Sequence, residues 1–225
     1  MPPSKVHLYL VSFVRENVAF QDRATGLYGL GSFAIQLGLA AIRQLDVIDL
    51  AADTLIDLRD RTDCAVYLSL WGDRGPCIVA KADGSLQGVF SVRLGYMLPL
   101  TATATGLVFL THLPETETER ALDAQAAFEG RGTGRRASRA ALSTAISQVR
   151  HDGYASTLGR LHRNFAGIAA PIFDYSGQIA AAITLLGPAE YMRDGKQDEL
   201  AQLLLEAAAG ISLRLGAPGS EDGTG

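Results

Sequence analysis

Residues 167–188, GIAAPIFDYSGQIAAAITLLGP, constrain the fold more than any other part of the sequence. Apolar side chains alternate along both halves of this segment, at Ile168, Ala170 and Ile172 and then at Ile179, Ala181, Ile183 and Leu185. A period of two is typical of strands, and the intervening residues 174–177 contain Asp, Ser and Gly, which favour turns. The segment therefore predicts a β-hairpin.

The opposite face of this hairpin carries mostly small side chains, at Ala169, Pro171, Phe173, Ala180, Ala182, Thr184 and Leu186. Small residues leave space above a sheet. That space either lets a helix approach closely or becomes the floor of a largely apolar pocket with Thr184 as its polar anchor. The hairpin alone leaves both alternatives open.

Length and charge restrict the class of protein. A chain of 225 residues can form one sizeable core with an appendage, or two modest domains, and a net charge of −4 excludes a protein that binds polyanions over its whole surface. The apolar runs are shorter than the roughly 20 residues of a membrane span. His7, Ser12 and Arg15 interrupt the N-terminal apolar residues, so we expect no signal peptide and a cytoplasmic protein.

The cysteines and histidines show no pattern of a reactive or metal site. A turn at residues 72–75 would pair Cys77 with Leu70, which leaves Cys64 out of register for a disulfide. The four histidines are scattered and lack metal-ligand spacing. The sequence also lacks a nucleophile elbow, a phosphate loop or a zinc motif. We therefore expect no enzyme, no metal and no cofactor.

The N-terminal residues change period once. Residues 3–17 place Val6, Tyr9, Leu10, Phe13 and Val14 on one helical stripe, and residues 18–21 and 27–30 favour a small hairpin. A helix followed by a small hairpin is typical of the second half of a winged helix. A surface helix with a β-ribbon would show the same pattern.

The rest of the chain predicts helices and short strands in one α+β fold, an antiparallel sheet with packed helices. Helices are expected at residues 32–43, 46–61, 102–112, 138–152 and 197–215, with Asp46 capping the second of these, and strands at 65–71, 76–82 and 89–94. Residues 129–139 are expected to form a flexible basic loop, and residues 217–225 a disordered tail.

Several motifs resemble the IclR family of bacterial transcription regulators. They are SKVHLYL at residues 4–10, TGLYGLG at 25–31, GYMLPLTATATG at 95–106, GYA at 153–155, IAAPIFDYSG at 168–177 and AAITLLGP at 181–188. The resemblance implies a partial winged helix at residues 1–31, a linker helix at 32–45 and a GAF-like effector-binding domain at 46–216, before the tail at 217–225.

The same resemblance implies that Ser4, Lys5 and His7 contact double-stranded operator DNA. Leu8 stands where the family commonly has Arg, which removes one cation from this helix. Met1 falls where the family's recognition helix begins, so the two preceding helices are not in this sequence. Either the start is assigned too late, or the chain is a fragment, or it no longer binds DNA as the family does.

The resemblance also implies a pocket for a small organic acid or aromatic effector. Its residues would be Gly95, Tyr96, Met97, Pro171, Thr184 and Leu186, with Tyr67 adding an aromatic wall. Members commonly carry acidic residues where this chain has Arg160 and Arg163. We therefore hypothesise that one of them, with Arg160 foremost, binds an anionic group of the effector. A solvated loop would carry the same residues.

These features lead to two hypotheses about function. The first is a ligand-responsive transcriptional regulator, assembled as a homodimer or homotetramer, in which effector binding in the C-terminal domain changes operator binding. The alternative is a stand-alone small-molecule-binding module that oligomerises through residues 4–31 and does not bind DNA. Neither has a membrane partner.

Overall fold

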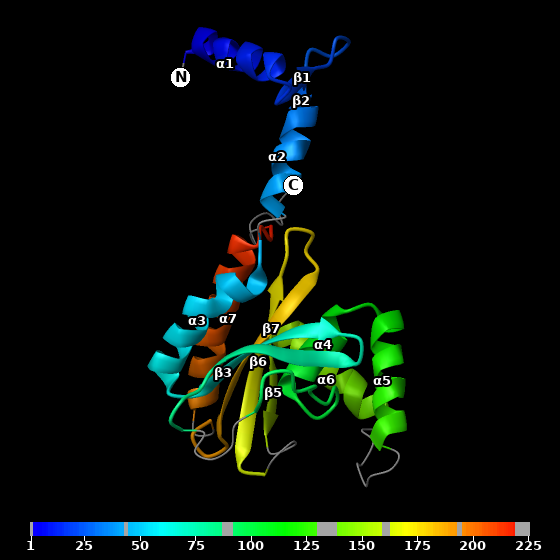
Figure 1. Cartoon of the computed structure of the whole chain (residues 1–225). Helices are drawn as coiled ribbons and strands as arrows, with labels where there is room; N and C mark the ends of the chain where they lie inside the picture. The colour runs from blue at the N-terminus through cyan, green and yellow to red at the C-terminus, as the bar shows by residue number, and fades with distance from the viewer. Residues whose placement is uncertain are drawn as a thin grey trace. The chain divides into compact units, whose positions relative to one another are not determined.

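The computed structural model describes residues 2–42, 45–86, 92–129, 139–158, 163–192 and 195–218. The chain forms two compact units, Met1–Asp46 and Val47–Gly225, each with its own internal packing. Figure 1 shows the elements of both units along the chain. Among the described residues, no helix is long and apolar enough to cross a membrane.

The first unit contains the predicted helix and hairpin. Its elements are α1 (Pro3–Arg15), β1 (Ala19–Gln21), β2 (Tyr28–Leu30) and α2 (Ser32–Ile42). β1 and β2 are antiparallel, with Ala19 opposite Leu30. The Asp22 carboxylate accepts hydrogen bonds from the backbone N–H groups of Ala24 and Thr25, each at 2.8 Å, and Gly26 adopts φ +73°. These local bonds make the turn.

The second unit is built around one antiparallel sheet. Its helices are α3 (Val47–Thr62), α4 (Ala104–His112), α5 (Glu115–Glu129), α6 (Arg139–Asp152) and α7 (Lys196–Arg214). Its strands are β3 (Ala65–Gly72), β4 (Gly75–Ala82), β5 (Ala155–Leu158), β6 (Phe165–Phe173) and β7 (Ile179–Pro188), in the order β4-β3-β7-β6-β5. This arrangement confirms the predicted α+β fold.

β6 and β7 form the predicted hairpin at the centre of the sheet. Ile168 lies opposite Leu185, so their side chains share one face. The Asp174 carboxylate accepts hydrogen bonds from the backbone N–H groups of Ser176 and Gln178, and Gly177 adopts φ +76°. The turn therefore uses the residue types that favour it in sequence.

The two faces of the sheet are covered by different helices, as Figure 1 shows. Ile168, Ile172, Ile183 and Leu185 pack in one core with α3 and α7, where Leu58 and Leu204 are fully buried. On the other face, Ala169 and Ala182 pack against α4 and α6. The small residues of the hairpin thus let α4 approach closely, which is one of the two alternatives that the sequence left open.

β3 and β4 meet in the predicted register, with Leu70 opposite Cys77, and both cysteines are free thiols. The strand predicted at residues 89–94 is wrong in its described part, because Val92–Leu94 is not a strand. Instead, the backbone of the following segment joins the edge of β4: the Ile78 N–H donates to the Tyr96 carbonyl, and Met97 bridges Cys77. Residues 87–91 lie outside the described part.

One further difference concerns a helix. The sequence did not predict α5, whose strongly polar sequence ETETERALDAQAAFE has no clear apolar stripe. The predicted basic loop and tail fall mostly on residues 130–138 and 219–225, which lie outside the described part. α6 ends as predicted at Gly153, which adopts φ +79° and donates its N–H to the Val149 carbonyl.

Candidate functional site

A cavity lies on the α4 face of the sheet, between the N-terminal end of α4 and strands β3, β5, β6 and β7. It has about 550 Å³ of space between its walls, open solvent at its mouth included, and about 50 Å³ admits the centre of a water molecule. The cavity is therefore of a size for a small organic molecule.

Three classes of side chain line the cavity. The apolar walls are Ile78, Val92, Leu98, Phe165 and Leu186; the hydroxyl groups belong to Tyr67, Thr103, Thr105, Thr157 and Thr184; and the small residues are Ala102, Ala104 and Gly167. No Lys, Arg, Asp or Glu is among these described lining residues. Such a site favours a largely apolar ligand held by a few polar contacts.

The register of the sheet brings the floor residues together. Tyr67 pairs with Thr184, and Gly167 pairs with both Leu186 and Thr157. Because residues directly opposite one another in antiparallel strands point to the same face, these side chains converge under α4. Strands distant in sequence thus form one continuous floor.

The N-terminus of α4 forms the opposite wall. The Thr103 hydroxyl caps the helix by accepting a hydrogen bond from the Gly106 N–H at 3.0 Å, and it donates to the Pro99 carbonyl at 2.7 Å. The helix itself offers no acceptor for the N–H groups of Ala104 and Thr105, which belong to its first turn. A helix N-terminus carries partial positive charge, so this wall favours an anion.

A buried pair of hydroxyl groups connects this wall to the floor. The Oγ1 atoms of Thr105 and Thr184 lie 2.8 Å apart, and the residues are 2% and 7% exposed. One hydroxyl donates to the other, so one proton of the pair has no acceptor among the described residues. That proton can be donated to a ligand oxygen.

Tyr67 adds a third hydroxyl group to the cavity. Its phenol oxygen accepts a hydrogen bond from the Val92 N–H at 3.5 Å. Burial raises the pKa of the Tyr67 phenol, and this effect outweighs the opposing one of the Val92 N–H. Tyr67 therefore stays neutral at physiological pH.

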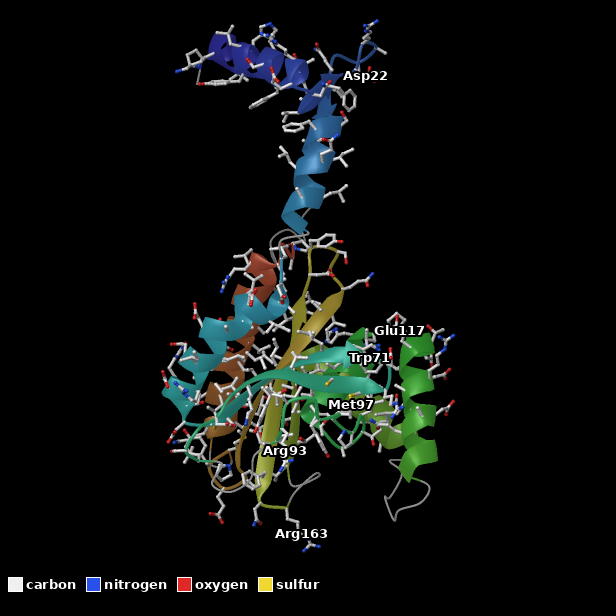
Figure 2. All side chains as sticks on the ribbon, in the orientation of Figure 1. Asp22, Trp71, Arg93, Met97, Glu117 and Arg163 are labelled. Atoms are coloured by element: carbon white, nitrogen blue, oxygen red, sulfur yellow. The ribbon has the colours of Figure 1, made fainter. Side chains whose placement is uncertain are left out.

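The structure brings together only part of the site inferred from sequence. Tyr67, Thr184 and Leu186 line the cavity. Pro171 is buried farther along β6, opposite Ala182, and lies outside the lining. Arg160 lies outside the described residues, and Figure 2 shows the Arg163 side chain pointing outward near the start of β6.

Gly95, Tyr96 and Met97 are also outside the lining. They form the segment beside β4, where Tyr96 is 44% exposed, and the lining residues Val92 and Leu98 flank them. Figure 2 shows Met97 in this part of the unit. The role of all three in ligand binding stays a prediction.

Sequence reasoning missed several lining residues. Ala104 and Thr105 belong to the TATATG motif, and Gly167 begins the hairpin segment, but none was assigned to the site. The alternation of β6 was a usable signal for Gly167, because it shares a face with Ala169. Nothing in the local sequence marks Ile78 or Phe165 as pocket residues.

The DNA-binding residues inferred from sequence all fall on α1. Lys5 and His7 are exposed there, and Ser4 belongs to the first turn. Two apolar residues, Leu8 and Val11, are 68% and 50% exposed on the same helix. Within the described residues, no group of three His, Cys, Asp or Glu could hold a metal ion.

Comparisons with known proteins agree with this architecture. The HTH-type transcriptional regulator XynR of Escherichia coli (strain K12) is 26% identical over 215 residues, which cover 96% of this chain and 85% of that protein. The glycerol operon regulatory protein of Streptomyces griseus is 31% identical over 219 residues, covering 94% and 83%. These relatives are regulators rather than enzymes, in agreement with the sequence-based prediction.

Solved structures show the same fold. The crystal structure of Pseudomonas aeruginosa HmgR matches with a TM-score of 0.87 and 34% identity, over 98% of this chain and 87% of that one. The Thermotoga maritima IclR structure matches with a TM-score of 0.67 and 25% identity, over 96% and 87%. The family model described as bacterial transcriptional regulator IclR C-terminal matches residues 39–213. Because that match spans most of the chain, the protein belongs to the IclR family of bacterial transcriptional regulators.

Proposed function

We propose that this regulator binds a small carboxylic acid with an apolar or aromatic body in the cavity under α4, and that binding changes its affinity for operator DNA. The observation that carries this proposal is the junction of the α4 N-terminus with the Thr105–Thr184 hydroxyl pair inside apolar walls. A carboxylate there can accept hydrogen bonds from backbone N–H groups and from one hydroxyl.

The rest of the ligand would lie against the apolar walls. Ile78, Leu98 and Leu186 provide aliphatic surface, and Tyr67 provides an aromatic face. The segment Gly95, Tyr96 and Met97 would close over the ligand, and Pro171 would support the floor from farther along β6. Arg160 remains a candidate for a second contact to the anionic group.

A single tryptophan allows this binding to be measured. Trp71 packs against Phe109 of α4, with ring centroids 5.5 Å apart, and α4 carries the anion-binding end of the cavity. We expect titration with phenylacetate or butyrate to change Trp71 fluorescence and to raise the melting temperature, since a ligand that binds only the folded state stabilises it. The matched amides, phenylacetamide and butyramide, lack the charge and should bind much more weakly.

Two variants test the contacts. Thr184→Val removes the hydroxyl at constant size and should weaken acid binding about tenfold. Arg160→Ala tests the second contact: acid binding should be weaker in this variant if the Arg160 side chain reaches the carboxylate. Ser143→Ala, at an exposed position of α6, is the matched control. If no small acid binds more tightly than its amide, the proposed anionic effector is wrong.

The DNA-binding half of the proposal rests on the first unit. We propose that residues 1–31 form part of a winged helix that contacts operator DNA through Ser4, Lys5 and His7. Residues 32–45 would link it to the effector-binding domain at 46–216, and residues 217–225 would form a tail. Relatives described as HTH-type regulators match 96% of the chain, which supports this organisation. The proposal places the protein in the bacterial cytoplasm, where the DNA is.

Apolar exposure on α2 supports a homodimer or homotetramer. Phe33, Ile35, Leu37 and Leu39 are 42% to 61% exposed and lie on two opposite sides of the helix. A helix that is apolar all round is suited to burial. Contacts between copies would bury these side chains and bring two DNA-binding units together. Light scattering would measure the assembly.

Fluorescence anisotropy on DNA from upstream of the protein's own gene tests operator binding. The chain should be compared with a form extended to any earlier in-frame start, at moderate salt. Lys5→Ala should weaken binding, whereas Lys196→Ala in the second unit is the matched control. A bound effector should change the affinity by about 5-fold to 150-fold. If neither form binds, the DNA-binding half of the proposal loses its main support for this chain, and the alternative of a stand-alone effector-binding module is favoured.

A further inference from the structure

The side chain of Gln125 on α5 binds two main-chain groups of the segment that joins the edge of β4. Its Oε1 atom accepts a hydrogen bond from the Leu100 N–H at 3.0 Å, and its Nε2 atom donates to the Leu98 carbonyl at 3.2 Å. The same Nε2 atom lies near the start of β4, 3.7 Å from the place of a Cβ atom added at Gly75. One side-chain amide therefore acts here as a neighbouring strand would.

Pro76 explains why the segment needs this partner. The Leu98 N–H donates to the Pro76 carbonyl at 2.8 Å, next to the antiparallel bridge between Cys77 and Met97. A pair at this place in an antiparallel ladder normally exchanges two hydrogen bonds. Proline has no N–H, so Pro76 cannot return the bond to the Leu98 carbonyl. The Gln125 amide supplies the missing donor.

The segment held by Gln125 connects two walls of the cavity. Leu98 lines the cavity itself, and the chain then continues into the N-terminus of α4, whose Ala104 and Thr105 also line it. The Leu100 backbone packs so closely on α4 that a Cβ atom added at Gly106 would lie 2.2 Å from the Leu100 carbonyl oxygen. A shift of this segment would therefore move both walls.

We propose that Gln125 is a positioning residue, which holds the Leu98 wall and the N-terminus of α4 in place for ligand binding. Gln125 is not among the described lining residues, so it acts through Leu98 and Leu100 rather than by touching the ligand. The inference rests on the proposed function and adds a residue outside the cavity on which effector affinity depends. A wall that is already in place does not have to be ordered by the ligand, which increases affinity.

Gln125→Leu tests this role, because it removes both hydrogen bonds and keeps a side chain of similar size. We expect phenylacetate to bind roughly tenfold more weakly, since the ligand must then re-form a segment that is in place only part of the time. Calorimetric titration would measure the affinity. In the ligand-free protein, hydrogen exchange of peptides covering residues 97–101 should be faster than in the wild type.

Ser212→Ala is the matched control for a general loss of stability. The Ser212 hydroxyl on α7 accepts a hydrogen bond from the Phe173 N–H at 2.9 Å, and α7 packs on the face of the sheet opposite to α4. This variant also leaves a main-chain group without its side-chain partner, so it should lower the melting temperature as well. Its phenylacetate affinity should stay within about twofold of the wild-type value, because no wall of the cavity moves.

A second substitution at Pro76 provides a rescue. Pro76→Ala introduces an N–H on the side of β4 that faces Leu98, because the N–H and the carbonyl of one strand residue point to the same neighbour. In the Gln125→Leu background it should restore affinity by about threefold or more, whereas in the wild-type background it should have little effect. A merely structural loss elsewhere in α5 would not be rescued at this position.

The outcomes separate this inference from the proposed function. If the wild-type protein binds phenylacetate and Gln125→Leu binds it equally well, only the inference fails. A loss of affinity that Pro76→Ala does not reduce also overturns it, because the loss then does not come from the Leu98 carbonyl. If neither phenylacetate nor butyrate binds the wild-type protein, the anionic effector is wrong. Hydrogen exchange of residues 97–101 then decides alone: faster exchange in Gln125→Leu supports the positioning role, and unchanged exchange overturns it.

Discussion

The hydroxyl oxygens of Thr105 and Thr184 lie 2.8 Å apart and connect α4 to β7 across the candidate cavity. Both residues are buried, so each hydroxyl depends on the other as its partner. A buried hydroxyl that loses its only partner incurs a desolvation cost, whereas replacing both partners by groups of the same shape can be nearly neutral.

Thr184→Val should therefore destabilise the protein by about 1 to 3 kcal/mol, because it leaves the Thr105 hydroxyl unpaired. The double variant Thr105→Val/Thr184→Val should recover most of that loss. Urea denaturation of the single and double variants would measure the free energy of unfolding. Additive losses in the double variant would show that the two hydroxyls do not act as a pair.

Gly106→Ala should be strongly destabilising. The added Cβ atom would lie 2.2 Å from the Leu100 carbonyl oxygen and 2.6 Å from the Leu100 carbonyl carbon, both of them backbone atoms. We expect a loss of about 1 to 3 kcal/mol or more, since α4 must move away from residue 100. Thermal unfolding would measure it against Gly210→Ala. A variant as stable as the wild type would contradict the close packing of α4 on this turn.

His112 should make stability depend on pH. Its ring packs edge-on against Phe173 at 5.1 Å, and its buried Nε2 atom has no hydrogen-bond partner among the described residues. Burial, and secondarily the charge of Arg150, lowers the pKa of His112 below its ordinary value of 6.5. The unfolded chain therefore takes up the proton first, so stability is lost as pH falls from about 6.5 towards the folded-state pKa.

His112→Phe should reduce this loss. The variant keeps an aromatic ring against Phe173 and has no titrating group, so its free energy of unfolding should fall less between pH 7.5 and pH 5.5 than that of the wild type. Urea denaturation at the two pH values would measure the difference. Equal losses in both proteins would show that His112 does not contribute.

The two thiols should react at very different rates. Burial raises the pKa of the Cys64 thiol to about 11, and this residue is fully buried, whereas Cys77 is partly exposed on β4. At pH 8, a thiol reagent should modify Cys77 in the native protein and reach Cys64 only on unfolding. Mass spectrometry of the Cys77→Ala variant provides the control. Rapid native labelling of Cys64 would contradict its burial.

Local pattern was enough to predict the elements that the site is built on. The hairpin of β6 and β7 follows from alternation on either side of an Asp-Ser-Gly turn, and the pairing of Leu70 with Cys77 follows from a short turn of fixed position. Strand alternation and turn formation depend on residues within a few positions of one another, so the sequence alone is enough to predict these elements. The resemblance to the IclR family was confirmed by the match over residues 39–213.

Local pattern was not enough for elements whose form depends on tertiary contacts. The polar helix α5 has little apolar periodicity, yet its Gln125 side chain accepts a hydrogen bond from the Leu100 N–H and donates to the Leu98 carbonyl. The sequence of Val92–Leu94 alternates like a strand, but the segment that joins the edge of β4 is centred on Met97. The formation of α5 and the position of this edge segment both depend on contacts with residues far away in the sequence.

The sequence by itself determined the hairpin and the family. The tertiary structure decided which residues form the cavity, because its walls come from segments far apart in the chain: Thr105 meets Thr184 only when α4 packs on β7. Gln125 meets Leu98 and Leu100 for the same reason, since only folding brings α5 beside the segment that joins β4.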